Sequence, residues 1–491
     1  MSIDLRDRLY VGGEWIRASG GEEAIINPAT EAVIALAPVG AEAEVEASIA
    51  AAREAFDRGT WPRMSTSERA DVLAHFVDWL ADQRTAIVDL IVREAGATQM
   101  LAAALHFDVP MKHARYLLDE ARRLEPQATR AEVTPSFDGR LTLGAAFTHF
   151  DPIGVVSAIT PYNFPFFLNI VKVVHALVMG NTVVLKPSPY TPFEALVFAQ
   201  AAHAVGLPRG VLNVVTGGVE EAARLTSDPR VDMVTFTGSD RVGEMIAAQA
   251  APTLKKVHLE LGGKSALIVR ADADIEAAAH AGVAGFTIHC GQGCALTTRM
   301  LVHSSVREQY VARVAELASS LKIGDPADPQ VALGPLIRAQ ARERVARYVE
   351  IGRQQGARLV TGGAIPEGFD RGFFYRPTLF DQVDNRAAIA QDEIFGPVGV
   401  VIDFDTDEEA IELANASAFG LSGGIFSGDT GRAYEMAKQL RTGGVAINGG
   451  AGTMLSGAPF GGIKRSGYGR ENGREGLLEF ANAKSISFHA G

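Results

Sequence analysis

The sequence predicts an α/β protein made of two parallel-sheet α/β domains and a small β-ribbon. Between residues 154 and 250, short apolar strands alternate with amphipathic helices, an order typical of parallel βαβ units. A second block of this kind follows from about Lys264 to Arg441. Between residues 132 and 150, Asp138-Gly139 separates two short strand-like runs, a pattern typical of a hairpin.

The periodicity of apolar residues places the elements in order. Residues 40–125 carry Ala-rich patterns with apolar positions three or four apart, as in 42–57 and 66–81, which predict packing helices. The first block is expected to hold strands over 154–159, 182–185, 211–215 and 233–236, and helices over 166–179, 192–204, 220–228 and 241–250. The second is expected to hold strands over 266–269, 300–303, 398–404 and 445–448. The ribbon pairs 133–136 with 140–143, and a protruding ribbon needs a partner, so we expect an oligomer contact there.

Size and charge narrow the function classes. A chain of 491 residues exceeds the usual single core, so two or three domains are expected. With 21% charged and 47% hydrophobic residues, the composition is that of an ordinary soluble globular protein. The formal net charge of −12, with no Lys/Arg-rich tract, disfavours nucleic acid and anionic membranes as partners.

The cysteine count and the N-terminal residues predict a cytoplasmic protein. Two cysteines cannot form a disulfide framework and fit a reducing compartment, although Cys290 and Cys294 could pair under oxidation. The first eight residues lack the basic and apolar regions of a secretory signal. The most apolar stretch, 153–185, is interrupted by prolines, asparagines, a lysine and a histidine, so we do not expect it to span a membrane.

Two segments carry candidate catalytic groups. In Gly291-Gln292-Gly293-Cys294, small neighbours bring backbone N–H groups close to the sulfur, which favours a thiolate and an oxyanion beside it. The alternative is that Cys294 is a small buried hydrophobe. Glu260 lies in a short strand between Leu259 and Leu261, where an apolar setting would raise its pKa and suit a general base. The alternative is a solvated strand carboxylate.

Four further segments are candidate cofactor or oxyanion contacts. Thr237-Gly238-Ser239 joins a strand to a helix, as in pyrophosphate sites, but its glycines are spaced G-x-x-x-x-G instead of G-x-G-x-x-G. Lys186 follows a strand and could bond a ribose or phosphate, or be an ordinary surface lysine. Glu393 could fix a ribose beside Phe395, or the segment could be a plain turn. Asn163, in a doubly prolyl loop, could donate to an oxyanion or cap the next helix.

Together these motifs, in this order, closely resemble the aldehyde dehydrogenase superfamily over essentially the whole chain. The matching segments are Pro161 to Pro165, Lys186-Pro187, Thr237 to Ser239, Glu260 to Lys264, Gly291 to Cys294, Glu393 to Pro397 and Pro459 to Gly467. The resemblance implies a nucleotide-binding domain (1–128 and 150–263), a catalytic domain (264–477) and a bridging or oligomerisation domain (129–149 and 478–491). It also implies a homodimer or homotetramer.

The resemblance implies oxidation of an aldehyde to a carboxylic acid through a cysteine thioester. Cys294 would attack the aldehyde, the Asn163 amide and the Cys294 N–H would hold the oxyanion, and hydride would pass to the nicotinamide. Glu260 would then activate the water that hydrolyses the thioester. Lys172 and Glu471 match positions that the family uses for proton relay and support. Relatives that acylate coenzyme A lack the base, so Glu260 favours a free acid.

The resemblance also implies the cofactor and substrate contacts. The cofactor contacts expected are Ile159, Thr160, Lys186, Ser188, Pro189, Gly218, Gly238, Ser239, Gly243, Leu261, Glu393 and Phe395. Many NAD-preferring members have the motif Lys-x-x-Glu, and this chain has Pro189 at the position of the glutamate. The negative charge that would repel the 2′-phosphate of NADP is therefore missing. We expect NAD, with NADP use also compatible with the sequence. No metal is expected.

The substrate pocket is expected to be apolar and wide. Its expected lining is Phe164, Phe167, Leu168, Val171, Met454 and Leu455. This lining favours an uncharged aliphatic, terpenoid or aromatic aldehyde. Two alternatives stay open, a semialdehyde dehydrogenase with a charged substrate and a non-catalytic binding or structural relative.

Overall fold

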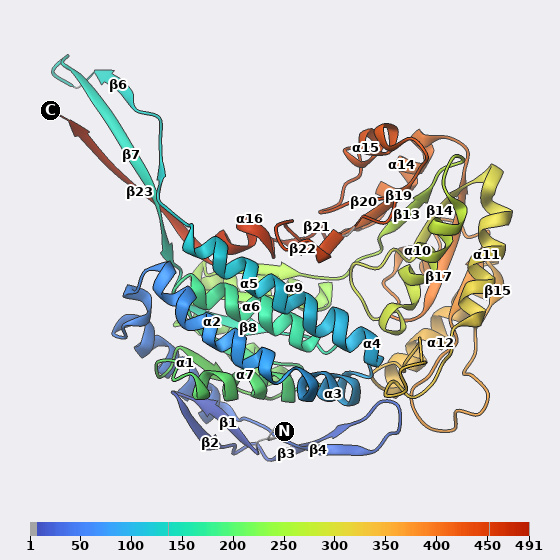
Figure 1. Cartoon of the computed structure of the whole chain (residues 1–491), viewed down its shortest axis with the longest axis horizontal. Coiled ribbons are helices and arrows are strands. Elements are labelled where there is room, and N and C mark those ends of the chain that lie inside the picture. Colours follow the sequence, from blue (N-terminus) through green and yellow to red (C-terminus); the bar gives the residue numbers. More distant parts are fainter. Residues whose placement is uncertain (1–6, 136, 451, 491) are drawn as a thin grey trace.

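Two large sheets with helices on their faces, and one projecting ribbon, make up the fold (Figure 1). The computed structural model describes residues 7–135, 137–450 and 452–490. The α/β class predicted from the alternation of strands and helices is confirmed. Within the described residues, no helix combines the length and the apolar character needed to cross a membrane.

The first sheet has eight strands with a buried parallel centre. Its order is β2 (Glu14–Arg17), β1 (Arg8–Val11), β10 (Leu212–Val214), β9 (Thr182–Lys186), β8 (Val155–Ile159), β11 (Met233–Thr237), β12 (Lys256–Glu260) and β22 (Gly467–Tyr468). Strands β8 to β12 run parallel, whereas β1, β2 and β22 are antiparallel at the edges. The central strands read as continuous apolar runs because both faces are covered. The carboxyl ends of β8, β9, β11 and β12 therefore meet at one edge.

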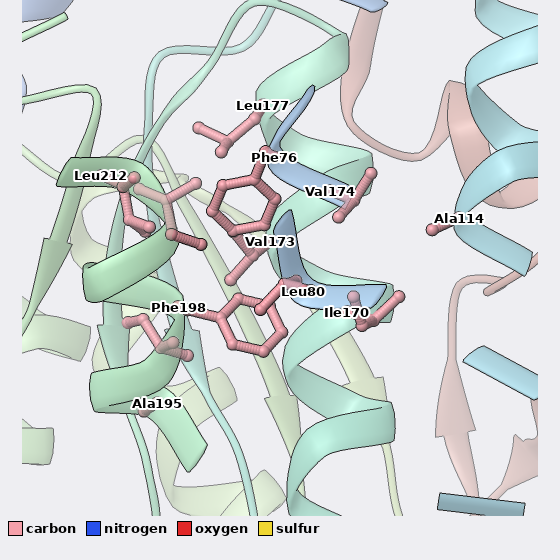
Figure 2. Packing of buried hydrophobic residues seen from close by; sticks show 14 of the residues in the cluster. Phe76, Leu80, Ala114, Ile170, Val173, Val174, Leu177, Ala195, Phe198 and Leu212 are labelled. Carbon is pink, nitrogen blue, oxygen red and sulfur yellow. The ribbon is translucent and has the colours of Figure 1, made fainter. Parts of the chain in front are cut away.

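Helices cover both faces of this sheet. They are α1 (Glu42–Asp57), α2 (Thr66–Asp82), α3 (Arg84–Ala95), α5 (Val109–Arg122), α6 (Pro165–Val178), α7 (Phe193–Ala204), α8 (Val219–Ser227) and α9 (Asp240–Ala250). Phe76 of α2 and Phe198 of α7 pack edge to face, with ring centroids 5.7 Å apart, and α6 lies against them (Figure 2). Aromatic contacts of this kind fix how α2, α6 and α7 are layered. Helix α6 is buried nearly all round, which explains its continuous apolar sequence.

The second sheet has seven strands and its own core. Its order is β15 (Arg358–Thr361), β16 (Thr378–Asp381), β17 (Val398–Phe404), β14 (Arg299–His303), β13 (Ala266–Val269), β19 (Gly423–Phe426) and β20 (Ala446–Ile447). All neighbours are parallel except β15 and β16. The covering helices are α10 (Ile275–Thr287), α11 (Arg307–Ser320), α12 (Ala339–Gln354), α14 (Asp407–Asn415) and α15 (Thr430–Ala437).

A long ribbon projects from the body of the molecule (Figure 1). Its strands are β5 (Gln127–Ala128), β6 (Glu132–Pro135), β7 (Leu141–Pro152) and β23 (Ala481–Ala490). The expected hairpin partners 133–135 and 141–143 fall within β6 and β7, whereas Arg140 precedes β7 and Ser136 lies outside the described residues. The ribbon joins segments more than 300 residues apart, because Ala481 pairs with Pro152.

Shorter elements complete the chain. They are β3 (Glu22–Ile26), β4 (Val33–Pro38), α4 (Gln99–Leu101), a π-helical segment (Ala102–Asp108), α13 (Ala388–Gln391), β18 (Phe419–Gly420), β21 (Ile463–Lys464) and α16 (Gly473–Leu478). The four N-terminal strands were not expected from the sequence. Each is short, and β1 joins the first sheet only through its pairing with β10, a contact about 200 residues away.

Candidate active site

A cavity of about 590 Å³ lies where the two large sheets face each other. Of the expected site residues, its lining includes Asn163, Phe164, Phe167, Leu168, Gly238, Ser239, Leu261, Cys294, Glu393, Phe395, Met454 and Glu471. Seven of these twelve follow strands or begin helices of the first sheet, so the edge at the strand carboxyl ends forms much of the wall.

The loop that carries Cys294 is held in an unusual backbone conformation. His289, Cys290 and Gly291 have φ of 50°, 54° and 74°, three successive left-handed residues before the cysteine. A Cβ on Gly291 would lie 2.1 Å from the carbonyl oxygen of Gly396, so only glycine fits there. The Gln292 side chain donates to His289 O (3.1 Å) and accepts from Ile337 N (3.0 Å), which anchors the loop.

Cys294 faces the cavity with its thiol protonated in the resting enzyme. Burial raises its pKa, and the carboxylates of Glu393, Glu260 and Glu471 raise it further. The small neighbours predicted a thiolate, and this prediction is wrong for the chain alone, because burial and nearby negative charge outweigh the backbone N–H groups. A positive charge placed in the site would lower this pKa and favour the thiolate.

Cys290 has a different environment from Cys294. It is 1% exposed and belongs to the core of the second sheet. Burial raises the pKa of its thiol. Both cysteines are free. Cys290 is therefore the buried small hydrophobe that was the alternative for Cys294.

Glu260 ends strand β12 and is almost fully buried. Neither carboxyl oxygen has a hydrogen-bond partner within the described part of the chain. Burial, followed by the negative charge of Glu471, raises the pKa of this carboxyl well above its usual range. The solvated alternative is thus excluded because the carboxyl is buried, and the direction of its pKa shift is the one expected of a general base. It does not line the cavity in this conformation; Gly461 leaves room for its carboxylate.

Lys172 and Glu471 form a buried ion pair. The Lys172 Nζ lies 3.0 Å from Glu471 Oε1 and 3.0 Å from Thr235 Oγ1. Lys172 is fully buried in α6, whereas Glu471 reaches the cavity wall. Opposite charges at this distance compensate each other's desolvation. The pair fixes one positive and one negative charge behind the cavity.

Asn163 is positioned toward the cysteine loop. Its Nδ2 donates to the carbonyl of Gln292 at 2.9 Å. Helix α6 begins after Phe164, without a side-chain cap. The alternative role of Asn163 as a helix cap is therefore excluded.

The expected cofactor contacts gather at the carboxyl ends of β8, β9 and β11. Ser239 accepts from Val242 N at the start of α9, and Gly243 lies against Leu261. Lys186 is 3% exposed, so it is not a surface lysine, and burial lowers its pKa to about 8. Glu393 accepts from Gly263 N at 3.0 Å, and burial raises its pKa to about 7.

The other expected contacts lie beside this edge but do not line the cavity. Ile159 and Thr160 are buried, and Thr160 donates to Asn169 Oδ1 at 2.8 Å. Ser188 is also buried, and Pro189 beside it is half-buried. Gly218 N donates to Glu221 Oε2 at 2.7 Å at the start of α8.

The apolar end of the cavity differs partly from the expected lining. Val171 is fully buried and Leu455 is 52% exposed, and neither lines the cavity. In their places stand Leu105, Ile288, Leu296 and Phe460. Leu105 comes from the π-helical segment, and no local pattern in the sequence links that segment to the cavity. Phe164 stacks on His106 of the same segment, with ring centroids 4.3 Å apart.

Two arginines also line the cavity and were not expected. The Arg338 guanidinium lies 4.4 Å from the centre of the Tyr190 ring and bonds its hydroxyl. Arg344 donates to the carbonyls of Glu393 (2.6 Å) and Ile394 (3.1 Å). Both side chains are held by contacts within the protein.

Comparison with known proteins identifies relatives along the whole chain. The model of the family described as "Aldehyde dehydrogenase family" matches residues 15–486. A 3-succinoylsemialdehyde-pyridine dehydrogenase of Pseudomonas sp. is 39% identical, covering 98% of each chain. Geranial dehydrogenase of Castellaniella defragrans is 38% identical, covering 99% of each chain. A Mycobacterium tuberculosis aldehyde dehydrogenase complexed with NAD+ has a TM-score of 0.92 at 42% identity, covering 98% of this chain and 97% of that one. These matches confirm the resemblance predicted from the motifs.

Proposed function

Because this chain belongs to the aldehyde dehydrogenase family, we propose that it oxidises an uncharged apolar aldehyde to the carboxylic acid, with NAD+ as hydride acceptor. Aliphatic, terpenoid and aromatic aldehydes are the candidate substrates. The observation that carries this proposal is the apolar wall around Cys294, which is formed by Leu105, Phe164, Phe167, Leu168, Met454 and Phe460. An apolar wall binds the apolar surface of a substrate, but it does not compensate the desolvation cost of a charged substrate group.

A charged semialdehyde is the second candidate. Arg338 and Arg344 line the cavity, and one relative is a 3-succinoylsemialdehyde-pyridine dehydrogenase. We rank it lower because Arg338 is stacked on Tyr190 and Arg344 is bonded to two backbone carbonyls. A substrate carboxylate would have to compete with these contacts.

The residues present fit a nicotinamide dinucleotide. Gly238 and Ser239 bring the N-terminus of α9 to the cavity, where backbone N–H groups favour a pyrophosphate. Lys186 and Ser188 would hold the adenosine ribose, and Glu393 the other ribose. When bound, NAD+ supplies the hydride acceptor and a positive ring charge. A positive charge is what the thiol needs to ionise, given the three carboxylates around it.

The chain's own residues then perform two chemical steps. The Cys294 thiol releases its proton to water and its sulfur attacks the aldehyde carbon, while the Asn163 amide and the Cys294 N–H hold the oxyanion of the thiohemiacetal. Loss of hydride leaves a thioester on Cys294. Glu260 takes a proton from water as the oxygen adds to the thioester carbonyl, and collapse of this adduct expels the thiolate and releases the acid. Glu260 must rotate toward the cavity to reach that water.

We also propose that the ribbon joins subunits into a homo-oligomer. It exposes a row of large apolar side chains, namely Val133, Leu141, Leu143, Phe147, Ile486 and Phe488. Apolar strands exposed in this way are typical of interfaces. Light scattering coupled to gel filtration would give the mass of the particle. A monomer at micromolar concentration would contradict the proposal.

The proposed activity is tested by the rate of nicotinamide reduction with purified protein. Geranial, octanal and benzaldehyde are compared with succinic semialdehyde, each with NAD+ and with NADP+. We expect turnover with the neutral aldehydes and a higher kcat/KM with NAD+. A higher kcat/KM for succinic semialdehyde would favour the second candidate. No reduction with any aldehyde would contradict the activity itself.

A further inference from the structure

A line of buried polar atoms connects the ion pair of Lys172 and Glu471 to Glu260. Thr235 of β11 and His258 of β12 are direct partners in the sheet register. Lys172 Nζ lies 3.0 Å from Thr235 Oγ1, and Thr235 Oγ1 lies 2.9 Å from His258 Nδ1. On the far side of the ring, His258 Nε2 lies 3.6 Å from Glu260 Oε1.

The direction of these hydrogen bonds follows from the donors available. The Lys172 ammonium has donors only, so the Thr235 hydroxyl must accept from it. The hydroxyl hydrogen of Thr235 is then free to be donated to His258 Nδ1. With Nδ1 accepting, the neutral imidazole carries its hydrogen on Nε2, the atom that faces Glu260.

His258 remains uncharged in this setting. Burial holds the pKa of its ring well below the usual value, and the positive charges nearby act in the same direction. The groups facing it are Lys172 and His175 of α6, Lys256 of its own strand and Arg470. Those facing Glu260 are Glu471, Lys172, Arg470 and Glu479. A neutral ring with hydrogen on Nε2 directs this donor toward Glu260 Oε1, which lies 3.6 Å away.

The gap to Glu260 is longer than a hydrogen bond, and His258 Nε2 has no other partner among the described residues. Both atoms are fully buried, so neither is satisfied by solvent. A small rotation of the Glu260 side chain would close this distance in the resting state, before the side chain turns toward the cavity. The hydrogen bond formed in this way stabilises an ionised carboxylate more than a neutral acid, because hydrogen bonds to charged groups are stronger.

We propose that His258 is a positioning residue for this reaction, which donates from Nε2 to the ionised Glu260 and so transmits the charge of Lys172 to the general base. The proposal rests on the proposed function, because it concerns the base of the deacylation step. Thr235 acts only by orienting the ring. The Nε2–H donor of His258 stabilises the anionic form of Glu260, and it thereby opposes the effect of burial on the pKa of Glu260.

Two amide substitutions separate this role from simple packing. In His258→Gln the amide nitrogen can occupy the position of Nε2 and still donate to Glu260. In His258→Asn the shorter amide reaches Thr235 but not Glu260. We expect His258→Asn to move the acid limb of the deacylation rate by about one pH unit to higher pH, which corresponds to about 1.4 kcal/mol. We expect His258→Gln to stay near the wild type.

The measurement is rapid mixing with NAD+ and octanal, with acid quenching and intact-mass detection of acyl-Cys294. A normal burst of reduced nicotinamide in both variants, with slower loss of the acyl group only in His258→Asn, would support the proposal. Equal pH profiles in the two variants would overturn it. The absence of any NAD+ reduction by the wild type with octanal would contradict the proposed function instead.

A second measurement keeps the test independent of the catalytic activity of the variants. Nitrogen NMR of the wild-type protein with labelled histidine, in which His258→Gln identifies the signal, reports which ring nitrogen carries the hydrogen. Hydrogen on Nε2 is expected. Hydrogen on Nδ1, or a charged ring at neutral pH, would overturn the proposal even if neither variant were active.

Discussion

The side-chain amide of Asn163 donates to the backbone carbonyl of Gln292 at 2.9 Å, two residues before Cys294. This bond joins the loop after β8 to the loop that carries the cysteine. An amide nitrogen has two hydrogens, so one remains to donate to an oxyanion formed at Cys294. Asn163 therefore positions the cysteine loop and offers a donor to the reacting centre.

Replacing Asn163 by alanine should slow formation of the thioester. Loss of one oxyanion donor costs about 10²–10³-fold in kcat. The burst of reduced nicotinamide in rapid mixing should slow by this factor, with a smaller change in KM. The thermal midpoint of the variant serves as the folding control. A burst of unchanged rate in a folded Asn163→Ala protein would remove Asn163 from the oxyanion site.

Cys294 should be alkylated slowly in the absence of cofactor. The three carboxylates and burial keep its thiol protonated, and the pKa of Glu393 is raised to about 7. As the pH rises through 7, Glu393 gains a negative charge and disfavours the thiolate further. In wild type the iodoacetamide rate should therefore climb less than tenfold per pH unit near pH 7, the slope that an isolated thiol gives.

Two single variants test this account. Glu393→Gln is the test variant, and Cys290→Ala is the control. The glutamine removes one negative charge, so the thiol pKa falls and alkylation becomes faster at neutral pH. Cys290→Ala should leave the rate unchanged, because Cys290 is 1% exposed. Slower alkylation of Glu393→Gln would contradict the electrostatic account of Cys294.

Replacing Glu260 by glutamine should separate the two halves of the reaction. The amide cannot take a proton from water, so the thioester should form normally and persist. We expect a burst of about one reduced nicotinamide per active subunit followed by a steady state slowed about 10²-fold or more. An unchanged steady state would mean that another group acts as the base.

The sequence predicted the residues whose role depends on local chain geometry. Cys294 follows a glycine turn and Glu260 ends a buried strand. Both features can be predicted from residues that are close in the sequence. The central strands of both sheets were also predicted, because fully buried parallel strands read as apolar runs.

What the sequence missed depends on contacts between distant segments. Leu105 reaches the cavity from the π-helical segment, and Arg338 and Arg344 reach it from around α12. Val171 was expected in the wall because it lies on the helix that follows the Asn163 loop. The helix turns that side chain into the interior instead. Similarly, the raised pKa of Cys294 arises from burial and from carboxylates on three other segments, which no local pattern contains.

Gly291→Ala should damage the cysteine loop. At a φ of 74° a side chain costs about 1–2 kcal/mol, and the new Cβ would also lie 2.1 Å from the Gly396 carbonyl oxygen. We expect a lower thermal midpoint and a loss of activity of about tenfold or more, since the displaced loop carries Cys294. Gly444→Ala is the control, because a Cβ there meets no atom within 4 Å. Equal stability of the two variants would contradict the packing argument.

The preference for NAD+ should depend on Glu221. Pro189 stands where many NAD-preferring relatives have a glutamate. Lys186 nevertheless has two acidic neighbours, Glu221 and Glu23. Their charges raise the pKa of Lys186, whereas burial lowers it. Glu221 lies in the first turn of α8 and accepts from Gly218 N at 2.7 Å. We expect a carboxylate in this position to repel a 2′-phosphate and to accept from a ribose hydroxyl, and so to replace the missing charge at Pro189.

Glu221→Gln keeps the size of the side chain and removes its charge. We expect the ratio of kcat/KM for NADP+ over NAD+ to rise about tenfold, mainly through a lower KM for NADP+, since a lost repulsion of about 1.4 kcal/mol corresponds to that factor. Glu220→Gln is the matched control, because Glu220 is the exposed neighbour on the same turn and does not act on Lys186. Steady-state kinetics with one aldehyde and both cofactors gives the two ratios. Equal ratios in the two variants would place cofactor selection elsewhere, with Glu23 as the remaining acidic group near Lys186.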